Sequence, residues 1–115
     1  DKIMQITSYI KNDSIFIVKL SGEVDLYNAN KIKDNIANHL KHSTARNIII
    51  NLDEVTYIDS TGIGTLISIR QMISGARGEL RLIHVTNSVK KIFELTKLNM
   101  LFKILDDEES AIATF

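Results

Sequence analysis

A chain of 115 residues is long enough to build one domain with its own hydrophobic core and too short for two. Hydrophobic residues make up 44% and charged residues 24% of it, which is typical of a folded globular domain and argues against disorder. The lack of cysteine excludes disulfides, thiol nucleophiles and cysteine-bound zinc, and the balance of 14 basic against 14 acidic residues gives no long-range field to attract nucleic acid.

The first predicted elements are two paired strands and a surface helix. Residues Ile3–Ile10 and Ser14–Leu20 alternate in polarity, and the polar residues 11–13 between them suit the turn of a hairpin. From Ala29 to Leu40 apolar side chains recur at helical spacing among polar ones, which predicts a helix with one buried stripe. Asn28 is its expected N-cap.

A strand, a loop and a second helix are predicted next. Residues Asn47–Leu52 form a short and nearly continuous apolar run, which is typical of a central strand covered on both faces. Residues Asp59–Gly62 follow as a polar loop. The helical spacing then continues from Ile63 to Ile73, until Gly75 and Gly78 end the pattern.

The remainder of the chain predicts a strand, a helix, a short strand and a terminal helix. The strand covers Glu79–Val85, Thr86 caps the helix after it, and Phe102–Leu105 form the last strand. The acidic residues Asp106–Glu109 suit the positive end of a short terminal helix. In the helix after Thr86, the side chains expected in the core are Val89, Ile92 and Phe93.

Strands that alternate with helices predict a largely parallel sheet with right-handed crossovers, to which the N-terminal hairpin adds an antiparallel edge. The fold class is therefore α/β, with one domain over residues 1–115, a mixed and mostly parallel sheet, and helices packed on it. The apolar runs are far shorter than the roughly 20 residues of a membrane span, and the first residues lack a signal-peptide pattern. A cytoplasmic protein without membrane contact is expected.

Two classes of enzyme fit the Ser60 loop poorly. Ser60 lies between a strand and a helix with Gly62 two residues on, as in half of a nucleophile elbow, but Ile58 occupies the first glycine position of that motif. Gly62 and Gly64 begin a dinucleotide fingerprint, but Ile67 occupies its third glycine position, and no Gly-Lys-Ser/Thr sequence marks a P-loop.

The three histidines add neither a catalytic base nor a metal site. His39 and His42 fall in the last turn of the first predicted helix, where a cation near the helix dipole explains both, and His84 ends a strand. No acidic residue stands near the two at a matching metal-ligand spacing. No catalytic residue, metal or cofactor is therefore predicted.

The polar run Asp59-Ser60-Thr61-Gly62 at the start of a helix is left to explain. One capping residue and a glycine for a tight turn account for part of it. Three capping-type residues in succession exceed what one helix end needs. The surplus hydroxyl suggests a position that is displayed to a partner or modified by one.

Around this run the sequence resembles the bacterial anti-sigma factor antagonists, which are small STAS-domain proteins. Residues 57–64, Tyr-Ile-Asp-Ser-Thr-Gly-Ile-Gly, look like that family's signature, whose usual form is Asp-Ser-Ser/Thr-Gly-Leu-Gly. Residues 22–29, Gly-Glu-Val-Asp-Leu-Tyr-Asn-Ala, are similar to its second signature, Gly-Glu-Leu/Ile-Asp followed by the first helix. Residues 80–83 and 92–96 also fit the family pattern. The resemblance covers nearly the whole chain.

The resemblance implies a binding switch rather than an enzyme. By this likeness, the unphosphorylated protein binds an anti-sigma factor that is a serine kinase and frees a sigma factor, the kinase phosphorylates Ser60, and a serine phosphatase opposes it. The free protein is expected to be a monomer without a cofactor. Thr61 is expected in the first turn of the helix, where its hydroxyl can bond local backbone. The implied partner-binding residues are Asp25, Asp59, Ser60, Thr61, Gly62 and Gly64.

Two alternatives stay open. One is a STAS component of another partner-switching pathway, in which a kinase and phosphatase pair controls a signalling enzyme. The other is a nucleotide-binding or hydrolytic enzyme that uses the Ser60 loop, although the sequence lacks the motif residues that such an enzyme needs.

Overall fold

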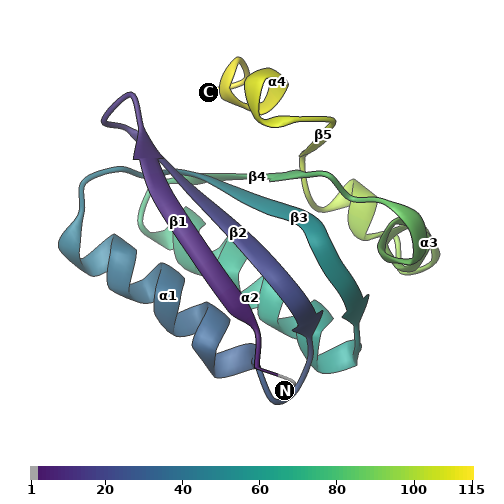
Figure 1. Cartoon of the computed structure of the whole chain (residues 1–115). Helices are drawn as coiled ribbons and strands as arrows, with labels where there is room; N and C mark the ends of the chain where they lie inside the picture. The colour runs from purple at the N-terminus through teal and green to yellow at the C-terminus, as the bar shows by residue number, and fades with distance from the viewer. Residues whose placement is uncertain (1–2) are drawn as a thin grey trace.

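The computed structural model describes residues 3–115. Five strands form one sheet in the order β1-β2-β3-β4-β5 (Figure 1). Their bounds are β1 Gln5–Lys11, β2 Ile15–Val24, β3 Asn47–Ile58, β4 Glu79–Ile83 and β5 Ile104–Leu105. The helical elements are α1 Ala29–His42, α2 Ser60–Gly75, α3 Asn87–Leu95, the 3₁₀ turn η1 Leu98–Met100 and α4 Glu108–Ile112. The predicted α/β class is confirmed.

The sheet is mixed, as predicted. Strand β1 is antiparallel to β2, and every other pair of neighbours is parallel. At the hairpin turn, Asn12 and Asp13 adopt left-handed backbone with φ of 55° and 60°, which these two residue types tolerate better than most. Helices α1 and α2 run along one face of the sheet, and α4 lies toward the other (Figure 1).

The main hydrophobic core lies between the sheet and its long helices. Ile48 and Ile50 of β3 pack there with Ile36 of α1 and Leu66 of α2, and all four side chains are fully buried. Ile49 points to the opposite face of the sheet, because successive strand residues alternate, and packs in a second apolar cluster with α4. Strand β3 is therefore covered on both faces at this point, as its apolar run predicts.

Strand β3 is longer than its apolar run predicts. Its pairing with β4 stops at Asn51, but its pairing with β2 continues to Ile58. The register between β2 and β3 shifts twice along this extension, and such irregularities break the strict alternation by which a strand is recognised in a sequence. Because of this extension, β3 runs past the end of β4, and Asp59 lies between the end of β3 and the start of α2.

The core face of α3 is narrower than predicted. Val89 and Phe93 are buried, as expected, but Ile92 is only half-buried and Leu95 is 77% exposed. Consecutive residues of a helix are separated by about 100°, so Ile92 and Phe93 cannot both point straight at the sheet. Thr86 precedes the helix as predicted, although its side chain makes no capping hydrogen bond.

His39 has a different role from the predicted one. Its ring is buried and stacks on Phe16 with 3.7 Å between the ring centroids, and its Nε2 donates to the carbonyl of Ala45 at 2.8 Å. Packing between α1 and the sheet therefore explains this histidine better than the helix dipole does. His42 is exposed at the end of α1, where the sequence places it.

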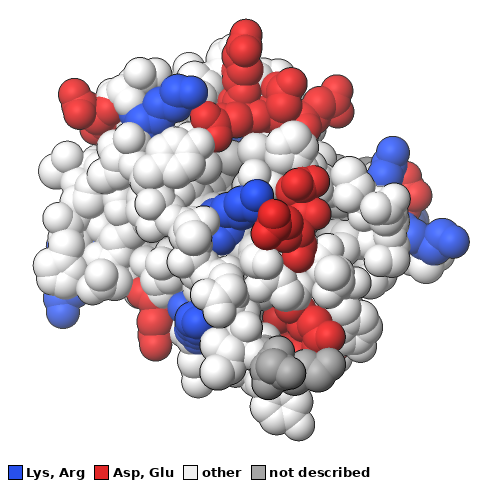
Figure 2. All heavy atoms as spheres, viewed as in Figure 1, with Lys and Arg blue, Asp and Glu red and all other residues white. Residues whose placement is uncertain are grey.

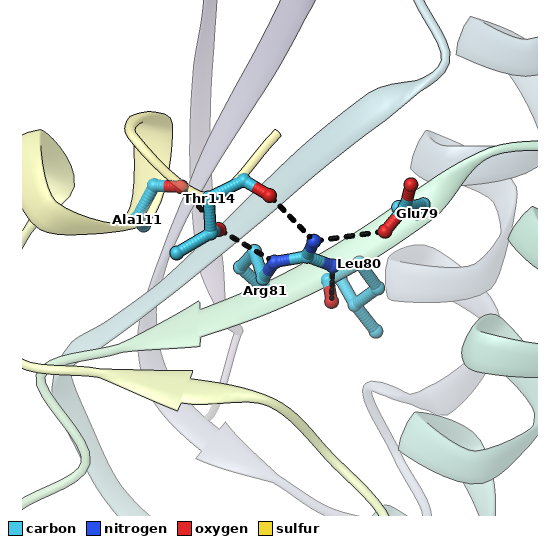
Figure 3. Close-up of polar contacts among 5 residues, drawn as sticks. All are labelled: Glu79, Leu80, Arg81, Ala111 and Thr114. Carbon is cyan, nitrogen blue, oxygen red and sulfur yellow. Dashed lines mark hydrogen bonds and ion pairs between the residues drawn. The ribbon is translucent and has the colours of Figure 1, made fainter.

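A buried arginine fixes the C-terminal segment to the sheet (Figure 3). Arg81 of β4 is 6% exposed, and it donates from Nε to Thr114 Oγ1 at 2.8 Å and from Nη2 to the Thr114 carbonyl at 3.2 Å. Nη2 also donates to Glu79 at 2.8 Å, and the guanidinium lies 4.6 Å from the centroid of the Phe115 ring. The charge is thus paired and hydrogen-bonded, as burial of an arginine requires, and the contact with the Phe115 ring adds a cation–π interaction.

A second contact ties α4 to the N-terminal hairpin. The Tyr9 hydroxyl donates to Glu108, and Lys11 Nζ lies 3.0 Å from the other oxygen of the same carboxylate. Acidic side chains gather over α4 on this side of the molecule (Figure 2). Glu108 itself joins α4 to strand β1 of the hairpin.

Raising the pH from about 10 to about 12 is expected to destabilise the wild-type protein more than the Tyr9→Phe variant. The hydrogen bond to Glu108, together with partial burial and the charge of that carboxylate, raises the pKa of Tyr9 to about 12. The folded protein therefore keeps a proton that the unfolded chain loses near pH 10, so the stability from this bond is present below that pH and lost above it. Urea unfolding of both proteins across this range measures the difference, and parallel curves would contradict the prediction.

Candidate functional site

Two loops meet at the carboxyl ends of β2 and β3. Val24 and Ile58 end these strands and are partners in the sheet. From there the chain enters α1 through residues 25–28 and α2 through Asp59, whose N–H donates to the Val24 carbonyl at 3.3 Å. The carboxyl ends of parallel strands are where α/β folds place functional residues. Residues 25–28 and 59–64, here named the α2 corner, are therefore the candidate site.

Asp59 holds both loops of the α2 corner. Its Oδ1 accepts a hydrogen bond from Gly62 N at 2.7 Å and so caps α2. Its Oδ2 accepts from Leu26 N at 3.4 Å, across the corner. The half-buried carboxylate thus lies at the N-terminus of α2, where the helix dipole favours a negative charge.

Because Asp59 supplies the cap, α2 does not need the hydroxyls of Ser60 and Thr61. Ser60 is exposed in the first turn, and its hydroxyl makes no hydrogen bond within residues 3–115. Thr61 is half-buried, and the bond predicted from its hydroxyl to local backbone is not formed among these residues; its carbonyl accepts from the Thr65 hydroxyl at 2.9 Å. Ser60 is the more accessible of the two hydroxyls.

The two glycines of the predicted site differ in what they permit. A Cβ on Gly62 would lie 1.9 Å from the Val24 carbonyl oxygen, so only glycine lets α2 approach the end of β2 this closely. Gly64 is exposed, and a Cβ there would meet nothing within 4 Å. It lies four residues after Ser60 and therefore on the same face of α2. Gly62 positions the corner, and Gly64 leaves surface open beside Ser60.

Asp25 and Asn28 hold the other loop from inside, where they are 6% and 4% exposed. Asp25 Oδ1 accepts from both Asn28 N and Asn28 Nδ2 at 3.1 Å. Asn28 Nδ2 also donates to the Glu23 carbonyl at 2.9 Å, and Asn28 Oδ1 accepts from Met4 N at 3.2 Å. Asn28 precedes α1 as predicted, but its side chain does not cap that helix.

Leu26 and Tyr27 are candidate site residues that sequence reasoning missed. They occupy the outer side of the loop that Asp25 and Asn28 hold, and both are exposed. The available signal was two large apolar residues in a short connection, where neither a helical nor a strand pattern requires them.

The α2 corner does not assemble the parts of a serine hydrolase. His39 and His42 lie near the far end of the 14-residue helix α1, and His84 follows β4, which stops well short of Ile58. Within residues 3–115, no group of three or more His, Cys, Asp or Glu side chains is placed to hold a metal ion. No helix in this part of the chain is long and apolar enough to cross a bilayer.

Known proteins resemble this chain over most of its length. Residues 7–111 match the family model of the STAS domain. The anti-sigma-B factor antagonist of Staphylococcus aureus (strain NCTC 8325 / PS 47) is 28% identical over 97 residues, which are 84% of this chain and 89% of that protein. A crystal structure of a candidate anti-sigma factor antagonist from Thermotoga maritima matches with a TM-score of 0.85 at 25% identity, covering 95% of this chain and 92% of that one. The Bacillus cell fate determinant SpoIIAA in its phosphorylated form shares the fold, with a TM-score of 0.71, 20% identity and coverage of 96% and 98%.

Proposed function

The chain belongs to the STAS domain family, and we propose that it acts as an anti-sigma factor antagonist. In its unphosphorylated form it binds an anti-sigma factor that is a serine kinase, and this binding releases a sigma factor. The kinase phosphorylates Ser60 and so ends the binding, and a serine phosphatase restores it. Its named relatives are regulatory proteins rather than enzymes. The proposal includes that it acts in the cytoplasm and is a monomer when free.

The exposed and unbonded hydroxyl of Ser60 beside a cap already supplied by Asp59 is the observation that carries this proposal. A kinase must reach the hydroxyl that it modifies, and removing a hydroxyl from a structural hydrogen bond would cost stability. Neither obstacle applies to Ser60. The loop geometry is held by Asp59 and Gly62, so it persists when Ser60 is modified.

The electrostatics of the corner suit a phosphate that acts at the surface. Phosphorylation adds about −1.5 to −2 charges at pH 7. The first backbone amides of α2 and the positive end of its dipole can hold that charge without unfolding the helix. Asp59 already contributes one carboxylate, so the modified corner becomes strongly negative and repels a partner surface that fits the neutral serine.

The implied partner-binding residues take two roles in this proposal. Those that offer accessible surface to the kinase are Ser60, Thr61 and Gly64. Those that hold the two loops in place are Asp25, Asp59 and Gly62. A deep residue such as Asp25 then affects binding through the shape of the loop.

Ser60→Ala is expected to abolish phosphorylation and to leave kinase binding intact, whereas Thr61→Ala is expected to accept phosphate. The two hydroxyls are neighbours, but Ser60 is exposed whereas Thr61 is half-buried. The measurement is tandem mass spectrometry after incubation with ATP and the anti-sigma factor kinase encoded in the same genome. ATP without the kinase is the control, and phosphate gained in that control or placed on Thr61 would contradict the proposal.

Ser60→Asp is expected to bind the same kinase more weakly than the wild-type protein does. One added carboxylate reproduces part of the phosphate charge, although it has fewer charges and fewer oxygens. Titration calorimetry with the purified kinase measures the change, for which a tenfold loss of affinity corresponds to about 1.4 kcal/mol. Equal affinity of Ser60→Asp and wild type would speak against an electrostatic switch.

A further inference from the structure

We propose that Leu26 and Tyr27 are the apolar anchors that the kinase buries when it binds the unphosphorylated α2 corner. This inference rests on the proposed function and names the part of the surface that supplies affinity. Leu26 is 63% and Tyr27 85% exposed, whereas the other large apolar residues of β2 and α1 are buried or half-buried. Two such side chains in one short loop need a reason to face water.

The polarity of this loop is the reverse of that of an ordinary surface connection. Its polar side chains, Asp25 and Asn28, point inward and are almost fully buried, while its apolar side chains point outward. The inward pair satisfies backbone groups at Glu23, Met4 and Asn28 itself. Such a buried network fixes the path of the backbone, and this path leaves Leu26 and Tyr27 displayed.

A fixed loop that displays a tyrosine and a leucine has the properties of a binding anchor. A tyrosine side chain has few rotatable bonds, so its burial in a partner costs little conformational entropy for the contact area gained. The loop itself is held by hydrogen bonds before the partner arrives, which removes a further ordering cost. Tight interfaces concentrate their energy in a few residues of this kind.

The anchors are continuous with the phosphorylation site. Leu26 N donates to Asp59 Oδ2 at 3.4 Å, and Ser60 follows Asp59 directly in the chain. A partner that seats Leu26 and Tyr27 in an apolar pocket therefore also covers Ser60. A phosphate at Ser60 needs water or cationic partners, so it opposes the dry contact that the anchors require. The occupant that we infer is an apolar pocket of the kinase that phosphorylates Ser60.

Asp25 acts in this arrangement as a positioning residue. Both hydrogen bonds from Asn28 end on Oδ1 of Asp25, and an asparagine at position 25 retains that oxygen. Asp25→Asn is therefore expected to keep kinase affinity within about twofold, whereas Asp25→Ala loses about tenfold or more. A direct ion pair between Asp25 and the kinase would give the opposite pattern for Asp25→Asn, with a loss close to that of Asp25→Ala.

The decisive experiment measures kinase affinity for variants of the displayed side chains. Tyr27→Ser and Leu26→Ser are each expected to lose about tenfold or more in affinity, with melting temperatures equal to that of wild type. Leu95→Ser removes a leucine from the end of α3 that is 77% exposed, against 63% for Leu26, and should change affinity less than twofold. Titration calorimetry with the purified kinase encoded in the same genome supplies the affinities.

The possible results distinguish a failure of the Leu26 and Tyr27 anchors from a failure of the proposed function. If the kinase binds wild type, Tyr27→Ser and Leu26→Ser with equal affinity, the anchors are excluded while the proposed function stands. If the kinase does not bind wild-type protein, both proposals fall. If Leu95→Ser weakens binding as much as Tyr27→Ser does, the kinase contacts a different surface and the assignment to the α2 corner is overturned.

Discussion

Replacing Gly62 by alanine is expected to lower the free energy of unfolding by about 3 kcal/mol or more. The new Cβ would lie 1.9 Å from the carbonyl oxygen of Val24 and 2.8 Å from its carbonyl carbon. Both atoms belong to the backbone at the end of β2, so no side chain can rotate away to make room. Relief requires α2 to move away from the sheet, and that movement opens the core around Leu66.

Gly64→Ala is the matched control for this prediction. The same methyl group is added two residues along the same helix, where a Cβ meets nothing within 4 Å. It should stabilise the protein by about 0.5–1 kcal/mol, because alanine loses less backbone entropy than glycine in a helix. Urea unfolding of the two variants and wild type measures both effects. A Gly62→Ala protein as stable as Gly64→Ala would show that α2 does not sit so close to β2.

Phe93→Ala is expected to cost about 3–5 kcal/mol of unfolding free energy. Phe93 is 1% exposed, and its ring lies 6.1 Å from that of Phe102, between α3 and the segment that leads to β5. The substitution leaves a large cavity in the main core, which rigid neighbouring strands cannot close. Phe93 belongs to α3, whereas Ser60 begins α2. The kinase should therefore still phosphorylate the Phe93→Ala variant at temperatures where the variant is folded.

Leu95→Ala provides the comparison for Phe93 on the same short helix. Its side chain is 77% exposed, so its truncation should change the unfolding free energy by no more than about 0.5 kcal/mol. Denaturant unfolding, with the slope checked for a constant two-state transition, gives both values. A small loss for Phe93→Ala would mean that α3 is loosely attached to the sheet.

The α/β architecture could be predicted from the sequence, because the hydrophobic periodicity of the segments and their order along the chain indicate the same fold. The run at residues 47–52 indicated a central strand, and the alternation of strands and helices indicated a parallel sheet. The missed features depend on tertiary context. The extension of β3 to Ile58 passes through Asp53 and Glu54, whose polarity hides a strand that only β2 supports through shifted register. The stacking of His39 on Phe16 joins residues from α1 and β2, and no local pattern announces it.

The sequence indicated which residue types form the candidate site, but not which way their side chains point. The motif at residues 57–64 indicated a polar helix start, and the structure assigns the cap within it to Asp59. Capping chemistry was equally available to Asp25 and Asn28, yet both turn inward. Asn28 bonds the backbone of Met4 and Glu23, and Asp25 accepts from the backbone and side chain of Asn28 within its own loop. Side-chain direction in a loop depends on where distant strands end, and that information is absent from local spacing.

Each strand of the sheet lies beside the strand that precedes it in the chain, so a nascent polypeptide can add strands one at a time as it leaves the ribosome. No later segment has to be inserted between two earlier ones. The contacts between the hairpin and α4 are different, because they join Tyr9 and Lys11 to a residue 99 and 97 positions away. Ile15, Ile17 and Ile49 share their apolar cluster with Ala111 of α4, so they lack this cover until α4 has been synthesised, and the nascent chain is most prone to aggregate on this face during that interval.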